Sequence, residues 1–329
     1  MSESLTILFS SAGRRVELMA AFRDAAAQLG CRCRIVAVDL RPKLSSACMA
    51  ADAAFAVPAC TENTFIPALL EICARERVHL VVPTIDPELL SFARTVPAFA
   101  AIGTEVAISA PEVIAMARNK IETTNFFQKI GLKTPQTALL SDVQHDTSSW
   151  SFPVLAKPID GSSSMGFQLL PSIQALRAFS AEARNHVVQQ YIAGREYTVN
   201  LFFDRTGLRC AIPHLRLETR GGEVSKGVTE KVPSLMEASA RIGEALAGKA
   251  FGPLCFQAMV SHENVPYLID LNARFGGGYP LAHRAGARFS QWMMESVLKR
   301  VSSASGAWRE GVLMVRYDAA IFTSFAGEQ

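Results

Sequence analysis

The 329-residue sequence lacks the features of several large protein classes. No apolar run reaches the roughly 18 residues that a membrane-spanning helix needs. The apolar residues 5–9 precede Arg14 and Arg15, which is the reverse of the order in a signal peptide. We therefore expect a cytoplasmic protein with no membrane partner. The formal net charge of +3 is too small to indicate a nucleic-acid partner, and 49% hydrophobic with 19% charged residues is a globular composition.

Metal-hydrolase and cysteine-protease motifs are also missing. The seven cysteines are scattered, and Cys31 and Cys33 form a C-x-C pair with no second pair at zinc-binding spacing. The six histidines form no H-x-x-x-H motif, and we find no Ser–His–Asp or Cys–His set. Any chemistry that this chain performs is therefore expected to proceed without a protein nucleophile.

The first third of the chain has the pattern of a parallel sheet. Short apolar runs at 5–10, 34–38 and 79–84 alternate with helical stretches, and this βαβ order predicts an α/β unit. Ligands of such sheets gather where the strands end. A dinucleotide site would depend on Gly13 and Asp39 alone, because G-x-G-x-x-G is absent, so a substrate pocket or a structural turn is favoured over NAD. The polar residues at these strand ends are Ser10, Ser11, Gly13, Arg14, Asp39, Thr84, Asp86 and Glu88.

The middle of the chain begins with a predicted helix and continues into a loop of small residues. Ser109, Pro111 and Glu112 predict the start of a helix that runs through 119–120 to Ile130. Further on, 152–170 reads FPVLAKPIDGSSSMGFQLL, a strand, a loop and a second strand. Glycines and serines can present backbone N–H groups and hydroxyls to phosphate oxygens, although the loop is not a Walker A motif and an ordinary flexible hairpin loop stays open.

Two charged features stand out against this background. Lys157 lies between apolar strand residues, where a lysine is rarely buried without an anionic partner. Residues 217–231 form a charged, glycine-containing loop, which is either solvated surface or a basic cover over an anionic reactant, through Arg220 and Lys226.

A β-hairpin in the last third carries oxygen-bearing side chains. Two apolar runs flank the turn 262–265, so we expect Gln257 opposite Asp270. Because side chains alternate along a strand, Asp270 and Asn272 share a face with Gln257, while Ile269 points into the core. One carboxylate and two amide oxygens suit Mg²⁺, which also takes phosphates and water as ligands. An ordinary solvent-facing strand is the alternative.

These features, in this order, resemble the ATP-grasp superfamily, and most of all the carbamoyl-phosphate synthetase large-subunit type with its stand-alone ligase relatives. The shared motifs are NK at 119–120, VLAKP and DGSSSMG within 154–166, VVQQYIAGREYTV at 187–199, FQ at 256–257 and LIDLNARFGGG at 268–278. The resemblance implies an α/β protein in which an N-terminal Rossmann-like, parallel-sheet (pre-ATP-grasp) domain precedes a two-lobed α+β ATP-grasp domain. The implied domains are 1–112, a lobe with a glycine-rich lid at 113–186, and a lobe with the magnesium and ATP site at 187–329.

The resemblance also implies roles for single residues. The basic residues contact phosphates, the small loop residues cover them, the residues after 188 meet the adenine, and Glu196 binds the ribose hydroxyls. The nucleotide-binding set is Lys120, Lys157, Gly161, Ser162, Ser163, Ser164, Gly166, Gln189, Gln190, Tyr191, Ile192 and Glu196. The metal ligands are Gln257, Asp270 and Asn272, and the catalytic contacts are Arg274, Lys226 and Arg216.

The chain departs from the family pattern at the adenine hinge and at the metal. Gln189 and Gln190 stand where many relatives have a glutamate, and Asp270 stands where glutamate is commoner. Gln257 replaces a second carboxylate found in many peptide-type ligases. We therefore expect a less negative metal site than in those ligases.

The implied function is an ATP-dependent carboxylate–amine ligase that forms an amide or peptide-like bond through an acyl phosphate, releasing ADP and phosphate. ATP and Mg²⁺ are the expected cofactors, with Mn²⁺ able to substitute. The expected partners are a small-molecule carboxylate and amine, with a homodimer as the default assembly. Two alternatives stay open: another acyl-phosphate-forming enzyme of the carbamoyl-phosphate synthetase or carboxylase type, and a nucleotide-binding module without turnover.

Overall fold

The computed structural model describes residues 3–160, 166–179 and 185–323, and the chain forms two compact units. Unit 1 contains residues 1–107, 290–303 and 316–329, and unit 2 contains 108–289 and 304–315.

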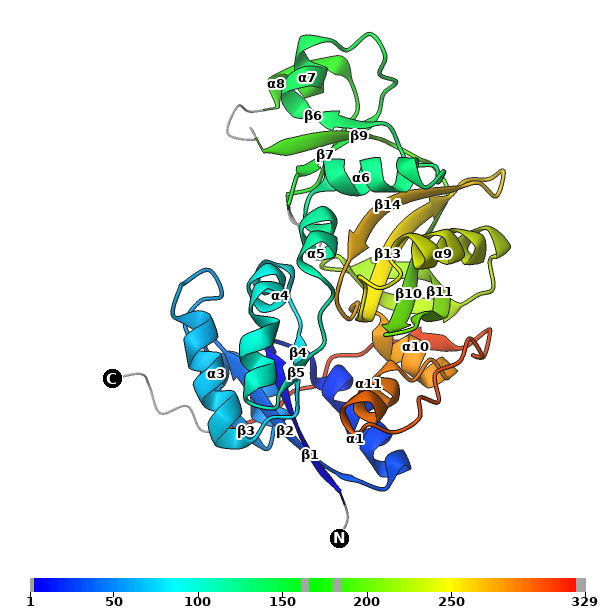
Figure 1. Ribbon diagram of the computed structural model, residues 1–329. Helices are drawn as coiled ribbons and strands as arrows, with labels where there is room; N and C mark the ends of the chain where they lie inside the picture. The colour runs from blue at the N-terminus through cyan, green and yellow to red at the C-terminus, as the bar shows by residue number, and fades with distance from the viewer. Residues whose placement is uncertain (1–2, 161–165, 180–184, 324–329) are drawn as a thin grey trace. The chain divides into compact units, whose positions relative to one another are not determined.

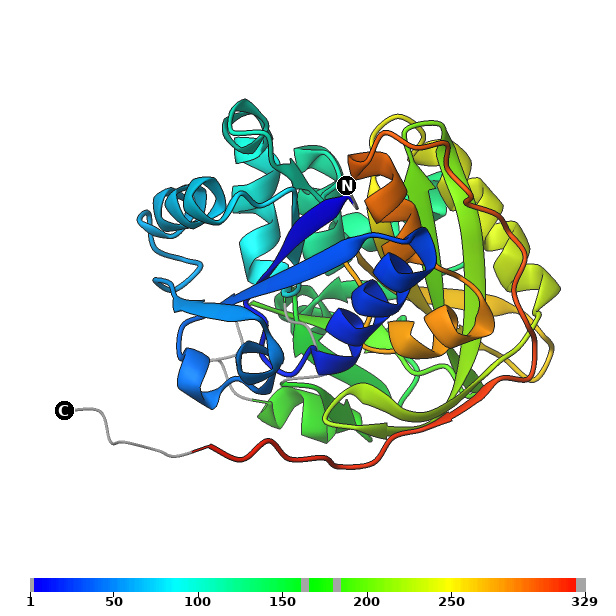
Figure 2. The same ribbon diagram turned by 90° about the horizontal axis from the view of Figure 1, so that it is seen from below.

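Unit 1 is built on a five-stranded sheet in the order β3-β2-β1-β4-β5, in which neighbouring strands are parallel. The strands β1 and β4 are buried almost throughout, because α1 covers one face of the sheet and α3 and α4 cover the other (Figures 1 and 2). Helix α11 (Phe289–Val297) lies almost wholly in this unit, where Ser290 Oγ donates a hydrogen bond to Ala21 O of α1. The other elements are β1 (Ser4–Ser10), α1 (Val16–Leu29), β2 (Arg32–Asp39), η1 (Pro42–Leu44), α2 (Ser46–Ala50), β3 (Ala53–Ala56), α3 (Phe65–Glu76), β4 (Leu80–Pro83), α4 (Asp86–Ala101) and β5 (Glu105–Val106).

Unit 2 contains two antiparallel sheets. The smaller has the order β6-β9-β7-β8, and α7 and α8 pack on one of its faces around Val154, Ala156 and Val188 (Figure 1). The larger has the order β14-β13-β10-β11-β12-β15, and α9 packs against its strands β10 and β11. The elements of the smaller sheet are β6 (Thr137–Leu139), α7 (Leu140–His145), β7 (Val154–Pro158), β8 (Gln168–Leu170), α8 (Ile173–Ala178) and β9 (His186–Gln190). Those of the larger sheet are β10 (Arg195–Asp204), β11 (Gly207–Arg220), β12 (Glu223–Thr229), α9 (Pro233–Ala245), β13 (Gly252–Val260), β14 (Pro266–Asn272), α10 (Tyr279–Ala285) and β15 (Leu313–Val315).

The single helix expected through residues 119–120 is in fact two helices, so that prediction is wrong. Helix α5 (Pro111–Arg118) ends at Asn119, whose backbone is extended, and α6 (Lys120–Lys129) begins at the next residue. The Asn119 side chain accepts hydrogen bonds from the backbone N–H groups of Ile121 and Glu122. Such a cap contributes about 1 kcal/mol to the helix that it starts, and here it fixes Lys120 in the first turn of α6.

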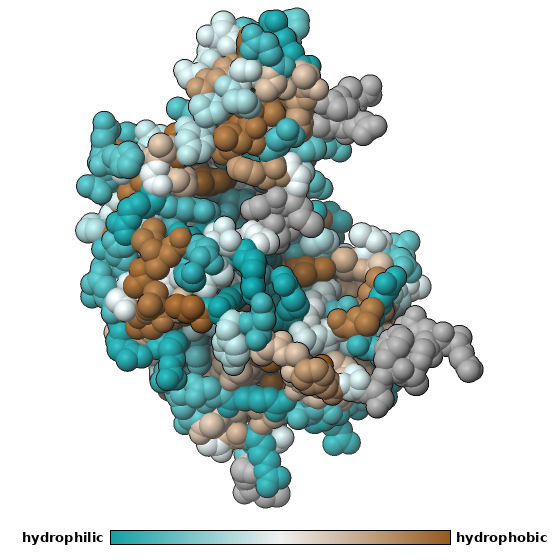
Figure 3. All heavy atoms as spheres, turned by 180° about the vertical axis from the view of Figure 1, so that it is seen from behind, coloured by the Kyte–Doolittle hydropathy of each residue, from teal (hydrophilic) through white to brown (hydrophobic). Residues whose placement is uncertain are grey.

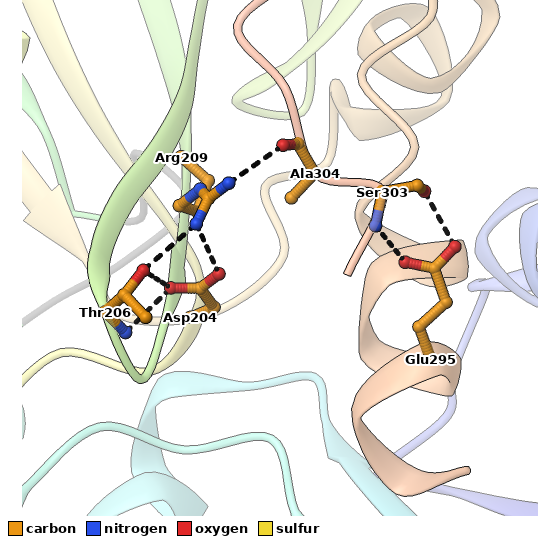
Figure 4. A network of polar contacts seen from close by, with 6 residues as sticks. All are labelled: Asp204, Thr206, Arg209, Glu295, Ser303 and Ala304. Carbon is orange, nitrogen blue, oxygen red and sulfur yellow. Dashed lines mark hydrogen bonds and ion pairs between the residues drawn. The ribbon is translucent and has the colours of Figure 1, made fainter. Parts of the chain in front are cut away.

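The chain passes from unit 1 to unit 2 between residues 303 and 304, and a polar network holds each side of this junction (Figure 4). In unit 1, the carboxylate of Glu295 accepts hydrogen bonds from Ser303 N and Oγ, each at 2.7 Å. In unit 2, Arg209 donates to Ala304 O at 3.2 Å and pairs with Asp204 in the β10–β11 turn. These contacts anchor the returning segment in each unit separately.

Figure 3 shows the hydropathy of one face of the molecule. On the face drawn in Figure 3, exposed apolar side chains form small groups among hydrophilic residues, as most protein surfaces do. Among the residues that the structure describes, no helix combines the length and the apolar character needed to cross a membrane.

The architecture confirms the predicted α/β class, with an N-terminal parallel sheet followed by two antiparallel lobes. The division at 1–112, 113–186 and 187–329 stays a prediction.

Candidate functional site

The register of the larger sheet gathers polar side chains on one of its faces. Gln257 of β13 pairs with Asp270 of β14 on one side and with Thr198 of β10 on the other. Asn272 and Asn200 flank Cys255 in the same way, two residues along. Because side chains two residues apart share a face, these strands present one continuous polar surface. The predicted pairing of Gln257 with Asp270 is confirmed.

A β-bulge lies beside Asp270. Ala258 pairs with Leu268 rather than with Ile269, so Ile269 is the extra residue in β14. Leu268 and Leu271 are each 1% exposed, whereas Ile269 is only partly buried. The expectation that Ile269 enters the core is therefore wrong, because the bulge shifts the alternation by one residue. Bulges re-aim neighbouring side chains, and this one immediately precedes the carboxylate of Asp270.

The end of β14 places an arginine beside these oxygens. Arg274 is 9% exposed, and its guanidinium donates to Asn272 Oδ1 at 3.4 Å and to Phe275 O at 3.1 Å. Among the described residues, no group of three or more His, Cys, Asp or Glu side chains is arranged so that it could hold a metal ion. The candidate metal site thus has one carboxylate and two amide groups, a weak donor set that fits a Mg²⁺ ion sharing its coordination with substrate phosphates and water.

Lys157 in β7 is held by a short chain of hydrogen bonds. Val154 and Ala156 belong to the core under α7 and α8, so Lys157 points to the opposite face of the smaller sheet. Lys157 Nζ donates to Gln189 Oε1 at 2.9 Å, and Gln189 Nε2 donates to Thr137 Oγ1 at 2.9 Å. Since Lys157 is 8% and Gln189 is 1% exposed, this chain lies away from solvent.

Burial lowers the pKa of Lys157 to about 8. The carboxylate of Asp270 acts against this effect and the ammonium group of Lys120 adds to it, so all three residues are close enough to interact. Lys120 is 5% exposed, and its backbone N–H donates to Ile159 O at 3.0 Å, just before the predicted lid. The structure thus brings together Lys120, Lys157 and Asp270, which lie on three different elements.

Of the predicted lid residues, Gly166 is described, and Gly161, Ser162, Ser163 and Ser164 lie outside the described residues. Gly166 has φ +73°, and a Cβ there would lie 3.0 Å from Pro158 Cγ. This position therefore requires glycine.

The predicted adenine hinge follows β9. Gln189 directs its side chain to Lys157, and Gln190 Oε1 accepts a hydrogen bond from Gln136 N at 3.3 Å. Tyr191 is 46% exposed, and Tyr191 and Ile192 lie just beyond the strand, where they belong to no sheet. Their contact with adenine stays a prediction.

The other predicted residues form two ion pairs. Arg216 donates to Glu196 and also to Gly222 O, and its side chain is 5% exposed against 35% for Glu196. Lys226 pairs with Glu218 at 2.7 Å, with both side chains about half exposed. Arg216 is therefore a buried side chain that links Glu196 of β10 to the turn of the β11–β12 hairpin, whereas Lys226 lies at the surface of this hairpin.

Sequence reasoning missed a buried pair on the same face. Asn200 is 1% and His214 is 0% exposed, and Asn200 Nδ2 lies 3.2 Å from His214 Nδ1. A Cβ at Gly278 would lie 2.6 Å from His214 Nε2, so the glycine segment 276–278 passes directly over this pair. The sequence did carry one sign of this buried pair, because Asn200 is a single asparagine within the apolar run YTVNLFF.

The polar residues at the ends of β1 and β4 in unit 1 form hydrogen bonds with the carboxylate of Glu88. Ser10 Oγ and Ser11 Oγ donate to one oxygen of Glu88, and Thr84 N and Ile85 N donate to the other. Burial nevertheless raises the pKa of Glu88. The hydroxyl protons of Ser10 and Ser11 and both carboxylate oxygens of Glu88, which were predicted to line a substrate site, therefore form hydrogen bonds within unit 1.

Gly13 and Asp39 are likewise joined to each other. Gly13 N donates to Asp39 Oδ2 at 2.9 Å, and Ala12 N donates to Val38 O at 3.0 Å. In a dinucleotide site, the N–H groups of this turn would face the pyrophosphate. In this structure the N–H groups of Gly13 and Ala12 donate to Asp39 and Val38 instead.

Comparison with known proteins agrees with this geometry. Residues 7–107 match the family described as PylC-like, N-terminal domain, and residues 182–320 match the family described as ATP-grasp in the biosynthetic pathway with Ter operon. A D-alanine–D-alanine ligase of Pseudomonas putida (strain GB-1) is 24% identical over 212 residues, which are 57% of this chain and 66% of that protein. The chain spans less than two thirds of the length of the first D-alanine–D-alanine ligases that it matches.

Solved structures show the same fold. An L-amino acid ligase from Bacillus licheniformis superposes with a TM-score of 0.68 at 17% identity, covering 94% of this chain and 78% of that one. The biotin carboxylase domain of Hydrogenobacter thermophilus 2-oxoglutarate carboxylase, in complex with MgADP, superposes with a TM-score of 0.69 at 14% identity, covering 91% and 71%. Residues 182–320 thus resemble an ATP-grasp family, and the superpositions show that the chain shares its fold with these two solved structures.

Proposed function

We propose that this protein is an ATP-dependent ligase that joins a carboxylate to an amine through an acyl phosphate. The observation that carries the proposal is the convergence of Lys120, Lys157 and Asp270 beside a sheet face that also holds Glu196 and Gln257. Two buried cations next to an oxygen-rich metal site suit a triphosphate bound with Mg²⁺. The D-alanine–D-alanine ligase and L-amino acid ligase relatives support amide-bond formation.

The proposed reaction has two steps. A carboxylate oxygen of the acid attacks the γ-phosphorus of ATP, the bond to the bridging oxygen breaks, and ADP leaves. The amine then attacks the carbonyl carbon of the acyl phosphate, phosphate leaves with the carbon–oxygen bond electrons, and the amine loses a proton. Phosphorylation is needed because a carboxylate has no adequate leaving group at neutral pH, whereas phosphate is one.

The residues of this chain would act by position and charge. Lys157 and Lys120 would hold the phosphates, Glu196 would accept hydrogen bonds from the ribose hydroxyls, and Arg274 would offset negative charge on the transferring phosphoryl group. Asp270, Asn272 and Gln257 would hold Mg²⁺, which supplies further charge neutralisation when bound. The lid at 161–166 would exclude water that otherwise hydrolyses the acyl phosphate.

The test is ADP release with Mg²⁺ and pools of candidate acids and amines. We expect release that requires both an acid and an amine, and a fall of about two to three orders of magnitude for Asp270→Asn, the scale for a lost electrostatic contact in an active site. Asp204→Asn, in the distant β10–β11 turn, is the matched control. Release that needs only bicarbonate would favour the carboxylase type instead, and nucleotide binding without release in any pool would favour a module without turnover.

The remaining predictions belong to this proposal. They are the use of Mn²⁺ in place of Mg²⁺, the three-part domain division, a homodimer and a cytoplasmic location.

A further inference from the structure

The β11–β12 hairpin is bent near its tip. Arg216 pairs with Gly227, but the register then shifts between Arg216 and Glu218 and again between Glu218 and Thr219. Two glycines with positive φ, Gly221 at +57° and Gly222 at +78°, make the turn. Bulges of this kind increase the twist of a hairpin and turn its tip away from the plane of the sheet.

The bent tip packs on the glycine segment 276–278. A Cβ at Gly277 would lie 2.8 Å from the carboxylate carbon of Glu223, and a Cβ at Gly278 would lie 2.9 Å from Val224 Cγ1. Val224 is 4% exposed. The first residues of β12 therefore cover the segment that follows the metal-site strand β14.

One guanidinium group connects this tip to the nucleotide side of the sheet. Arg216 Nη1 donates to Glu196, and Arg216 Nη2 donates to Gly222 O at 2.7 Å. Among the residues that the structure describes, the Nε atom of Arg216 is buried and has no hydrogen-bond partner. The Arg216 side chain is 5% exposed and the Glu196 side chain is 35% exposed, so solvent screens this pair less than an ion pair between two exposed side chains.

We propose that Arg216 is a positioning residue that couples the ribose site at Glu196 to the placement of the hairpin tip over residues 276–278. This inference depends on the proposed nucleotide site. Ribose hydroxyl groups bound to Glu196 hold its carboxylate in one position. The carboxylate then holds the guanidinium of Arg216 through their ion pair, and Arg216 holds the hairpin turn through its hydrogen bond to Gly222 O. The tip thereby becomes a fixed wall over residues 276–278 when a nucleoside diphosphate or triphosphate is bound. By linkage, a tip held in place also strengthens nucleotide binding.

Limited digestion with trypsin tests this coupling, because Arg220 offers a cleavage site within the tip. Cleavage after Arg220 is followed by mass spectrometry in the full-length protein, with and without saturating MgADP. We expect MgADP to slow this cleavage about tenfold in the wild type. We expect 2′,3′-dideoxy-ADP with Mg²⁺, which lacks the ribose hydroxyls, to slow it less than twofold at saturation.

Arg216→Lys keeps the charge beside Glu196 but cannot also reach Gly222 O. We expect it to raise cleavage without nucleotide severalfold and to abolish protection by MgADP. Arg241→Lys is the matched control, because Arg241 also bridges a carboxylate and a carbonyl, those of Glu237 and Gly131, but on the exposed side of α9. If Arg216→Lys does not fold, Glu196→Gln, which keeps the side-chain volume, replaces it as the test variant. We expect Glu196→Gln to lose the protection by MgADP.

Equal protection by the two nucleotides, or undiminished protection in Arg216→Lys, overturns the coupling. Neither result depends on turnover, so both differ from a failure to find ligase activity. If MgADP does not bind, the proposed function and the coupling fail together, and the change in basal cleavage still shows whether Arg216 holds the tip.

Discussion

Nucleotide binding should take up most of a proton at pH 9 but very little at pH 7, because of Lys157. Its folded pKa of about 8 lies below the ordinary value of 10.5, which corresponds to roughly 3 kcal/mol in favour of the neutral amine. Since the folded pKa is the lower one, the stability that Lys157 contributes is present above pH 10.5 and is lost as the pH falls to about 8. Phosphate oxygens beside the amine reverse this preference and raise its pKa.

The expected uptake follows from the fraction of neutral lysine in the free protein. At pH 9 about nine tenths of the free protein carries a neutral Lys157, and at pH 7 about one tenth does. Titration calorimetry with MgADP in two buffers of different ionisation enthalpy gives the number of protons bound. We expect about 0.9 proton at pH 9, about 0.1 at pH 7, and an affinity that falls towards tenfold for each pH unit above 8.

Lys157→Met is the decisive variant, because it keeps the length of the side chain without a titratable group. It should bind nucleotide weakly and with no proton uptake at pH 9. Lys299→Met, in unit 1, is the control and should behave as the wild type. Zero uptake by the wild type at pH 9, or the same uptake by Lys157→Met, would refute the assignment of Lys157 to the phosphate site.

Three further predictions follow from contacts around the site and in unit 1. Gln189→Glu places a carboxylate 2.9 Å from Lys157 Nζ, so it should raise the pKa of this lysine and abolish the uptake at pH 9, as measured by the same calorimetry; persistent uptake would contradict this. Gly278→Ala brings a Cβ within 2.6 Å of His214 Nε2 and should cost about 1–3 kcal/mol in the free energy of unfolding, whereas Gly306→Ala, with its nearest atom at 3.9 Å, should cost almost nothing. Glu88→Gln turns an NH₂ group towards two of the four donors around this side chain and should destabilise unit 1 by about 1–3 kcal/mol in urea unfolding, without changing the affinity for MgADP; a weaker affinity would show that unit 1 acts on the nucleotide.

Local patterns predicted much of the larger sheet. Alternation along two apolar runs placed Gln257 opposite Asp270, and the structure has this register. The same alternation failed at Ile269, because an extra residue in a bulge leaves no mark in composition. The break at Asn119 did leave one, an asparagine followed three residues later by Glu122, but helical periodicity on both sides obscured it.

Contacts between distant segments could not be predicted. Ser290 binds Ala21 across 269 residues, and no local pattern assigns the segment 290–303 to unit 1. The contacts of Arg216 with Glu196 and with Gly222 O could not be predicted either. They depend on two register shifts in the β11–β12 hairpin, which the sequence pattern does not show. Propensity and periodicity describe single elements, whereas these contacts depend on how elements bend and meet.

The central claim is that ATP energises a carboxylate by transferring its γ-phosphoryl group to it. The most direct measurement uses an acid whose carboxylate carries a heavy oxygen isotope, together with ATP, Mg²⁺ and the amine identified by ADP release. When the amine attacks the acyl phosphate, phosphate leaves with one of the acid's oxygens, so mass spectrometry should find the isotope in the released inorganic phosphate. Turnover that yields unlabelled phosphate, or that places the isotope in AMP, would contradict the account.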